Sequence, residues 1–143
     1  AVALVACQHP AVPLPHEAYV WQRQWTPAVV EALAQPAQLG ALRVLALEVD
    51  GPVMHRAASD LAALAGDGRP VWLVVRIEGS RLPLAAAALA PVLGELAAGW
   101  QQAGVRLAGI EIDHDTASAA LGDYARWLHA LRPQLPAGLP LSI

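Results

Sequence analysis

Short apolar runs alternate with helix-forming segments along this chain, in units of about 30 residues. The runs are rich in β-branched residues, and the segments between them carry helix starts and stops such as Thr26-Pro27 and Gly104. This alternation predicts an α/β fold of parallel strands with right-handed helical crossovers. Strands are expected at residues 19–23, 43–49, 71–77, 107–113 and 139–143, and helices at 26–35, 54–65, 83–103 and 118–131.

Two architectures accommodate this order of elements. A (β/α)8 TIM barrel needs roughly 250 residues, so this chain would supply its first half, with about five strands. An open doubly wound sheet is the alternative, because it can be complete at this length. The half-barrel is favoured, since no Gly-rich phosphate loop follows the first expected strand and the sequence stops within an apolar run at Ser142-Ile143.

The composition fits one domain with a substantial core, expected over residues 18–143. The chain has 143 residues, of which 56% are hydrophobic, and its formal net charge is -3. That mild negative charge gives no electrostatic footprint for nucleic acid, which is therefore not an expected partner.

Residues 1–17 are predicted to be a signal-peptide remnant and tether. Leu4-Val5-Ala6-Cys7 has the form of a lipobox, the acylation site of bacterial lipoproteins, and Cys7 is the single cysteine. The motif predicts a lipid anchor at Cys7 that holds the protein to a membrane of the cell envelope, on the periplasmic side. A free thiol in an apolar N-terminus is the alternative.

The stretch Glu111-Ile112-Asp113-His114-Asp115 is expected to end the fourth strand. Side chains alternate across a strand, so Glu111 and Asp113 share one face, and Asp115 joins them if the strand continues. Carboxylates are costly to bury, and these must be solvated, paired, bound to a cation or used on a substrate.

Other charged residues end the neighbouring strands. Because parallel α/β folds gather the carboxyl ends of their strands at one edge, all these groups are expected to meet at one mouth. The additional residues expected there are Glu48, Asp50, Arg76 and Glu78. They are predicted to bind substrate, and a structural ion-pair network around Arg76 is the alternative. A metal site is disfavoured, because neighbouring residues of a strand point in opposite directions, and no cofactor is expected.

Two motifs, at 19–25 and 111–115, resemble the DUF3142 proteins, a bacterial family of uncharacterised function. The segments 124–128 and 139–143 resemble that family too, so the similarity covers nearly the whole chain from Ala18. The resemblance implies an envelope lipoprotein that continues beyond this sequence.

The segment 108–115 is also similar to the fourth strand of family 18 glycoside hydrolases, whose pattern is Asp-Gly-apolar-Asp-apolar-Asp-x-Glu. Asp115 falls on the position of that family's catalytic acid, and Asp113 on the Asp that assists the substrate's acetamido group. Glu111 replaces the inner Asp, and Asp115 is one methylene shorter than Glu. The resemblance implies catalytic roles for all three residues.

Glycoside hydrolysis needs one protonated carboxyl and a second group that stabilises positive charge, which clustered acids can provide. Trp21 and Trp25 could stack on sugar rings, although core packing explains Trp25 equally well. The sequence thus predicts a glycoside-hydrolase-like barrel that hydrolyses or binds a polysaccharide. A non-catalytic carbohydrate-binding or scaffold lipoprotein is the alternative.

Overall fold

The computed structural model describes residues 16–34 and 39–143. The predicted anchor at Cys7 and most of the predicted tether lie outside these residues. Within the described ranges, no helix has the length and the apolar character needed to cross a membrane.

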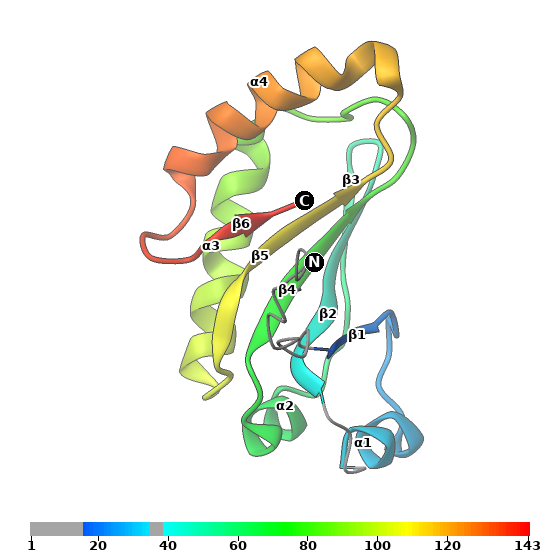
Figure 1. Ribbon diagram of the computed structural model, residues 1–143, viewed down its shortest axis with the longest axis vertical. Coiled ribbons are helices and arrows are strands. Elements are labelled where there is room, and N and C mark those ends of the chain that lie inside the picture. The colour runs from blue at the N-terminus through cyan, green and yellow to red at the C-terminus, as the bar shows by residue number, and fades with distance from the viewer. Residues whose placement is uncertain (1–15, 35–38) are drawn as a thin grey trace, which may run out of the picture.

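A mostly parallel sheet forms the centre of the fold (Figure 1). Its strands are β1 (His16–Val20), β2 (Leu39–Asp50), β3 (Val53–Arg56), β4 (Val71–Ile77), β5 (Leu107–His114) and β6 (Leu141–Ser142). The parallel strands lie in the order β1-β2-β4-β5-β6, and β3 pairs antiparallel with β2. This order follows the sequence without a reversal around β1. The predicted α/β fold is confirmed, and its strand order is consistent with a partial (β/α) barrel.

Helices follow the parallel strands as the alternation predicted. They are α1 (Pro27–Ala34), α2 (Leu61–Asp67), α3 (Ala86–Gln102) and α4 (Leu121–Leu131), with short 3₁₀ turns η1 (Ser118–Ala120) and η2 (Arg132–Gln134) on either side of α4. The view in Figure 1 shows α3 and α4 on the side of β5 and β6, and α1 and α2 near the amino-terminal ends of the strands.

The prediction of a single helix at residues 54–65 is wrong, because this stretch forms β3 and the first part of α2. A tight turn at Gly51, which has a φ of 56°, folds the chain back so that β3 pairs with the end of β2. Pairing with β2 provides hydrogen-bond partners for the backbone N–H and C=O groups of β3, and this outweighs the local tendency of the segment to form a helix. The helix starts only at Leu61, where the Asp60 side chain accepts a 2.9 Å hydrogen bond from the Ala63 amide.

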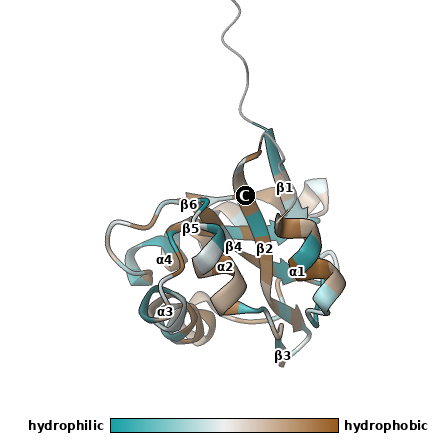
Figure 2. Cartoon of the chain, turned by 90° about the horizontal axis from the view of Figure 1, so that it is seen from below, coloured by the Kyte–Doolittle hydropathy of each residue, from teal (hydrophilic) through white to brown (hydrophobic). Residues whose placement is uncertain are grey.

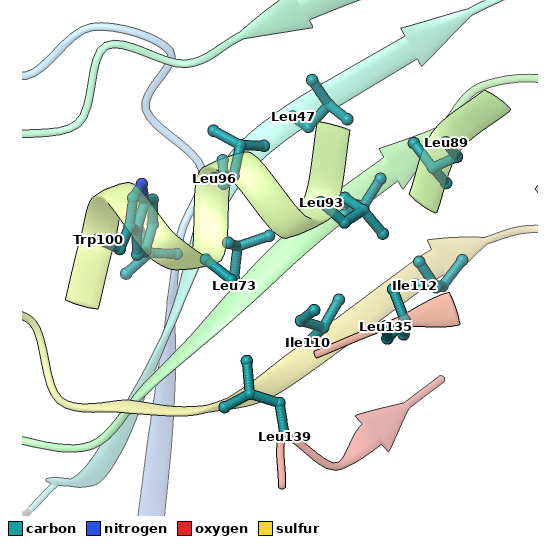
Figure 3. Packing of buried hydrophobic residues seen from close by; sticks show 14 of the residues in the cluster. Leu47, Leu73, Leu89, Leu93, Leu96, Trp100, Ile110, Ile112, Leu135 and Leu139 are labelled. Atoms are coloured by element: carbon teal, nitrogen blue, oxygen red, sulfur yellow. The ribbon is translucent and has the colours of Figure 1, made fainter. Parts of the chain in front are cut away.

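The hydrophobic core lies between α3 and the sheet. Figure 3 shows the helix presenting a row of apolar side chains to strands β4 and β5. The labelled residues include Leu89, Leu93, Leu96 and Trp100 of α3, and Leu73, Ile110 and Ile112 of the strands. Each fully buried side chain of this kind stabilises the fold by roughly 1.5–3 kcal/mol.

The hydropathy colouring distinguishes strand β2, inside the sheet, from helix α1 at the periphery (Figure 2). Strand β2 is hydrophobic along much of its length, whereas α1 carries both kinds of residue and buries none of them completely. This is the pattern expected for a strand in the interior of the sheet and a helix at the surface.

Candidate functional site

Most of the residues predicted to form a site lie on the sheet face opposite α3, which we call the inner face. The register of the strands places residues of neighbouring strands side by side on this face, in rows that cross the sheet. One row contains Tyr19, Arg43, Trp72 and Gly109, and a second contains Glu48, Arg76 and Asp113. The second row lies at the carboxyl ends of the strands. We call it, together with Glu78 and Asp115, the acidic mouth.

Arg76 is the centre of the acidic mouth. Its Nη1 donates to Asp113 Oδ2 at 2.8 Å and its Nη2 to Asp115 Oδ2 at 2.9 Å. Its Nε lies 3.4 Å from Glu78 Oε1. The hydrogen bond with Asp113 is the main reason that the pKa of Arg76 is raised above its ordinary value. One guanidinium thus serves three carboxylates, and the local charge stays negative.

This pairing has a chemical consequence for the predicted general acid. A carboxylate that accepts a hydrogen bond from a guanidinium is ionised, whereas a general acid must carry a proton. The Asp115 side chain is 82% exposed, however, and its pair with Arg76 is accordingly weak. Asp115 is therefore held by a contact that a ligand could displace.

Glu48 has a separate partner at the mouth. Arg23, just beyond β1, donates to Glu48 through Nε and through Nη2, the latter to Oε1 at 2.6 Å. These hydrogen bonds lower the pKa of Glu48 from its ordinary value. Asp50 is exposed at the turn between β2 and β3.

A shallow pocket of about 340 Å³ opens at the mouth. It combines an aromatic ring, two guanidinium groups and two carboxylates with one apolar wall. Its lining residues are Trp21, Arg23, Leu45, Glu48, Arg76 and Glu78.

Glu111 does not reach the mouth. Its side chain is buried deeper on the inner face, at 4% exposure. Tyr19 Oη donates to Glu111 Oε1 at 2.7 Å, and Arg43 Nη1 forms an ion pair with Glu111 Oε2. The catalytic roles of Glu111, Asp113 and Asp115 stay predictions, and the structure brings only the last two together.

The tryptophans separate into two groups. Trp21 is half-exposed beside the mouth, and its ring stacks on Tyr19 with centroids 5.2 Å apart and planes 1° from parallel. Trp25 instead packs against the hydrophobic core. Trp100 and Trp127 are buried in that core.

Several residues of the inner face were missed by sequence reasoning. Arg23 and Tyr19 carried a usable signal, because alternation from Trp21 places both on the face of that residue. Arg43 and Trp72 carried none, since each lies within a strand whose other residues are almost all apolar.

A larger cavity, of about 590 Å³, lies at the same end of β5 and is lined partly by His114, Thr116 and Tyr124. His114 Nδ1 is 3.2 Å from the carbonyl oxygen of Ile77, which can only accept, so this nitrogen carries a proton. His114 therefore turns away from Asp113 and Asp115. Across the described ranges, no three His, Cys, Asp or Glu side chains are placed to hold a metal ion.

Comparisons with known proteins give a fold relative and a family. The crystal structure of the Bacillus cereus spore cortex-lytic enzyme SleL matches with a TM-score of 0.50 and 16% identity, over 89% of this chain and 33% of that one. The chain thus spans about a third of that structure, and at this identity the match shows a shared fold. No curated protein matches the chain. The model of the domain of unknown function DUF3142 matches residues 67–143, which is more than half of the sequence, and the chain therefore belongs to the DUF3142 family.

Proposed function

We propose that this chain binds a polysaccharide at the acidic mouth, as part of a glycoside-hydrolase-like barrel. The observation that carries the proposal is the stacked pair of Tyr19 and Trp21 beside the row of Glu48, Arg76 and Asp113. Aromatic rings offer flat apolar surfaces to the faces of sugar rings, while fixed charged groups hydrogen-bond the hydroxyl groups around them.

The ion pairs support binding because they pre-orient polar groups. Asp113 and Asp115 each use Oδ2 for Arg76. Their Oδ1 atoms accept no hydrogen bond from the described part of the chain, and sugar hydroxyl groups can donate to them. Binding to groups already held in place loses less side-chain entropy than binding to mobile ones.

Hydrolysis of the polysaccharide is the second candidate function. It is favoured by the exposure of Asp115, because a substrate can reach this side chain by displacing its contact with Arg76. Asp113 is held by the same guanidinium, so the structure brings together two carboxyl groups of the kind that glycoside hydrolysis uses. The fold relative SleL is named a cortex-lytic enzyme, and this makes a carbohydrate-related function plausible.

A glycan array probed with the chain, followed by calorimetry on the best ligand, tests the proposal. Trp21→Ala should weaken binding about five- to tenfold, because the stacking surface is lost. Leu121→Ala is the control, since Leu121 is also an exposed apolar side chain but lies on α4. Failure of every glycan to bind, or binding that Trp21→Ala leaves unchanged, counts against the mouth as a polysaccharide site.

The proposed location is the cell envelope, with a lipid on Cys7. The support is the lipobox form of Leu4-Val5-Ala6-Cys7. Mass spectrometry of the native protein should find acylated Cys7, whereas an intact Ala6-Cys7 peptide as the main species would contradict the anchor.

A further inference from the structure

We infer that Glu111 is a positioning residue, which holds the Trp21 ring at the mouth through Tyr19. The part of this inference that concerns a glycan rests on the proposed function. The part that concerns the ring rests on the contacts of the inner face alone. The contacts run from Glu111 to Tyr19 and from Tyr19 to Trp21.

The first step is the fixed position of Glu111. A buried carboxylate is stable only when charged or polar groups satisfy it, and Tyr19 and Arg43 do so here. Charge-assisted hydrogen bonds are about twice as strong as neutral ones. The Tyr19 hydroxyl group is therefore held firmly at one point.

The second step is the rigidity of Arg43, the other partner of Glu111. Its Nε donates to Glu17 Oε2 at 2.6 Å, and its guanidinium carbon lies 4.9 Å from the centre of the Trp72 ring. The Trp72 ring in turn lies against Gly109 on the next strand. Arg43 is thus held by its ion pair with Glu17 and by the Trp72 ring. A movement of Glu111 toward the mouth would break the contacts of Glu111 with Arg43 and Tyr19.

The third step leads to the mouth. Tyr19 is anchored at its hydroxyl end, and its ring lies parallel to that of Trp21. A half-exposed Trp without such a neighbour samples several rotamers, and a ligand must then immobilise it. The anchored Tyr19 keeps the Trp21 ring oriented before a ligand arrives.

This role differs from the catalytic one that the motif implied for Glu111. Glu111 is absent from the residues that line the mouth pocket, and both of its oxygen atoms face residues of the inner face. It acts on the mouth through Tyr19, and its removal should change ligand affinity through the orientation of Trp21.

Fluorine NMR of the chain labelled with 5-fluorotryptophan tests the inference. The Trp21 resonance is assigned from its loss in Trp21→Phe. In Tyr19→Phe and in Glu111→Gln this resonance should shift or broaden, and affinity for the glycan selected by the array should fall roughly two- to tenfold. Glu95→Gln is the matched control, because Glu95 is exposed on α3 and pairs with Arg56.

An unchanged Trp21 resonance in Tyr19→Phe overturns the inference, whatever happens to affinity. Tyr19→Phe keeps the ring and removes one hydroxyl group at a half-exposed position, so it should fold even if Glu111→Gln does not. If no glycan binds, the proposed function fails, but the fluorine spectra still decide whether Glu111 positions Trp21.

Discussion

The indole ring of Trp72 lies against Gly109, in the space that a β-carbon on residue 109 would need. Such an atom would also be 2.7 Å from the carbonyl oxygen of Pro140, well inside normal contact distance. The absence of a side chain at Gly109 therefore permits both the close approach of Trp72 and the pairing of β5 with the segment that leads into β6.

Gly109→Ala should lower the free energy of unfolding by about 1–3 kcal/mol, because overpacking forces the Trp72 ring or the Pro140 backbone to move. Urea denaturation measures the change. Gly94→Ala in α3 is the matched control, since open space surrounds its β-carbon position, and it should raise stability by about 0.5–1 kcal/mol. Equal changes in the free energy of unfolding for the two substitutions would show that Trp72 and Pro140 can move aside at little cost.

The strands and their carboxyl-terminal acids could be predicted because each rests on a local pattern. The run 71–77 is apolar enough to be a strand on composition alone, and β4 has those bounds. Asp113 and Arg76 end neighbouring strands, and parallel pairing brings them into one row.

The partners on the inner face could not be predicted, because they depend on register. The register shifts between Leu45 and Leu47, and this bulge keeps Glu48 on the same face as Arg43 and Leu45. Simple alternation from Arg43 would have placed Glu48 on the helix side. The ion pair of Arg43 on β2 with Glu111 on β5 reaches across β4, which lies between these strands. Neither strand carries a sequence signature of this contact.

Asp115→Asn should separate binding from turnover. The substitution keeps the shape of the side chain but removes the transferable proton, so any glycosidase activity should fall by about 10²–10⁴-fold. Binding should change little, because the Asn Oδ1 atom can still accept from a sugar hydroxyl group and the lost ion pair with Arg76 is weak. Release of reducing ends from envelope polysaccharides measures the activity, and calorimetry measures binding.

Asp123→Asn is the control for the loss of an exposed carboxylate, because Asp123 lies on α4 and pairs with Arg126 there. Activity that survives Asp115→Asn intact would remove Asp115 as the acid. Absence of turnover in the unsubstituted chain, together with retained binding, would favour the binding function over hydrolysis.

Leu93→Ala should be strongly destabilising. Leu93 is fully buried between α3 and the sheet, and its truncation leaves a cavity that costs about 2–5 kcal/mol. Leu121→Ala removes the same atoms from an exposed position and should change stability by no more than about 0.5 kcal/mol. Thermal denaturation of both variants makes the comparison, and similar losses would contradict the packing shown in Figure 3.

Tyr124 should make the fold sensitive to alkaline pH. Burial, and secondarily the charge of Asp113, raises the pKa of the Tyr124 phenol to about 12, above the value of about 10 for an unfolded chain. Because the unfolded state ionises first, the contribution of Tyr124 to the free energy of unfolding is complete below about pH 10 and is lost as the pH rises toward about 12.

Tyr124→Phe keeps the ring and gives up only a long hydrogen bond of 3.5 Å to the Ile112 carbonyl oxygen. The variant should therefore lose less stability than the parent chain between about pH 9 and about pH 11 in urea titrations. Tyrosinate absorbance identifies the group, since Tyr124→Phe leaves only Tyr19 to titrate. Parallel stability curves for the two proteins across this range would mean that the phenol ionises as readily in the fold as in the unfolded chain.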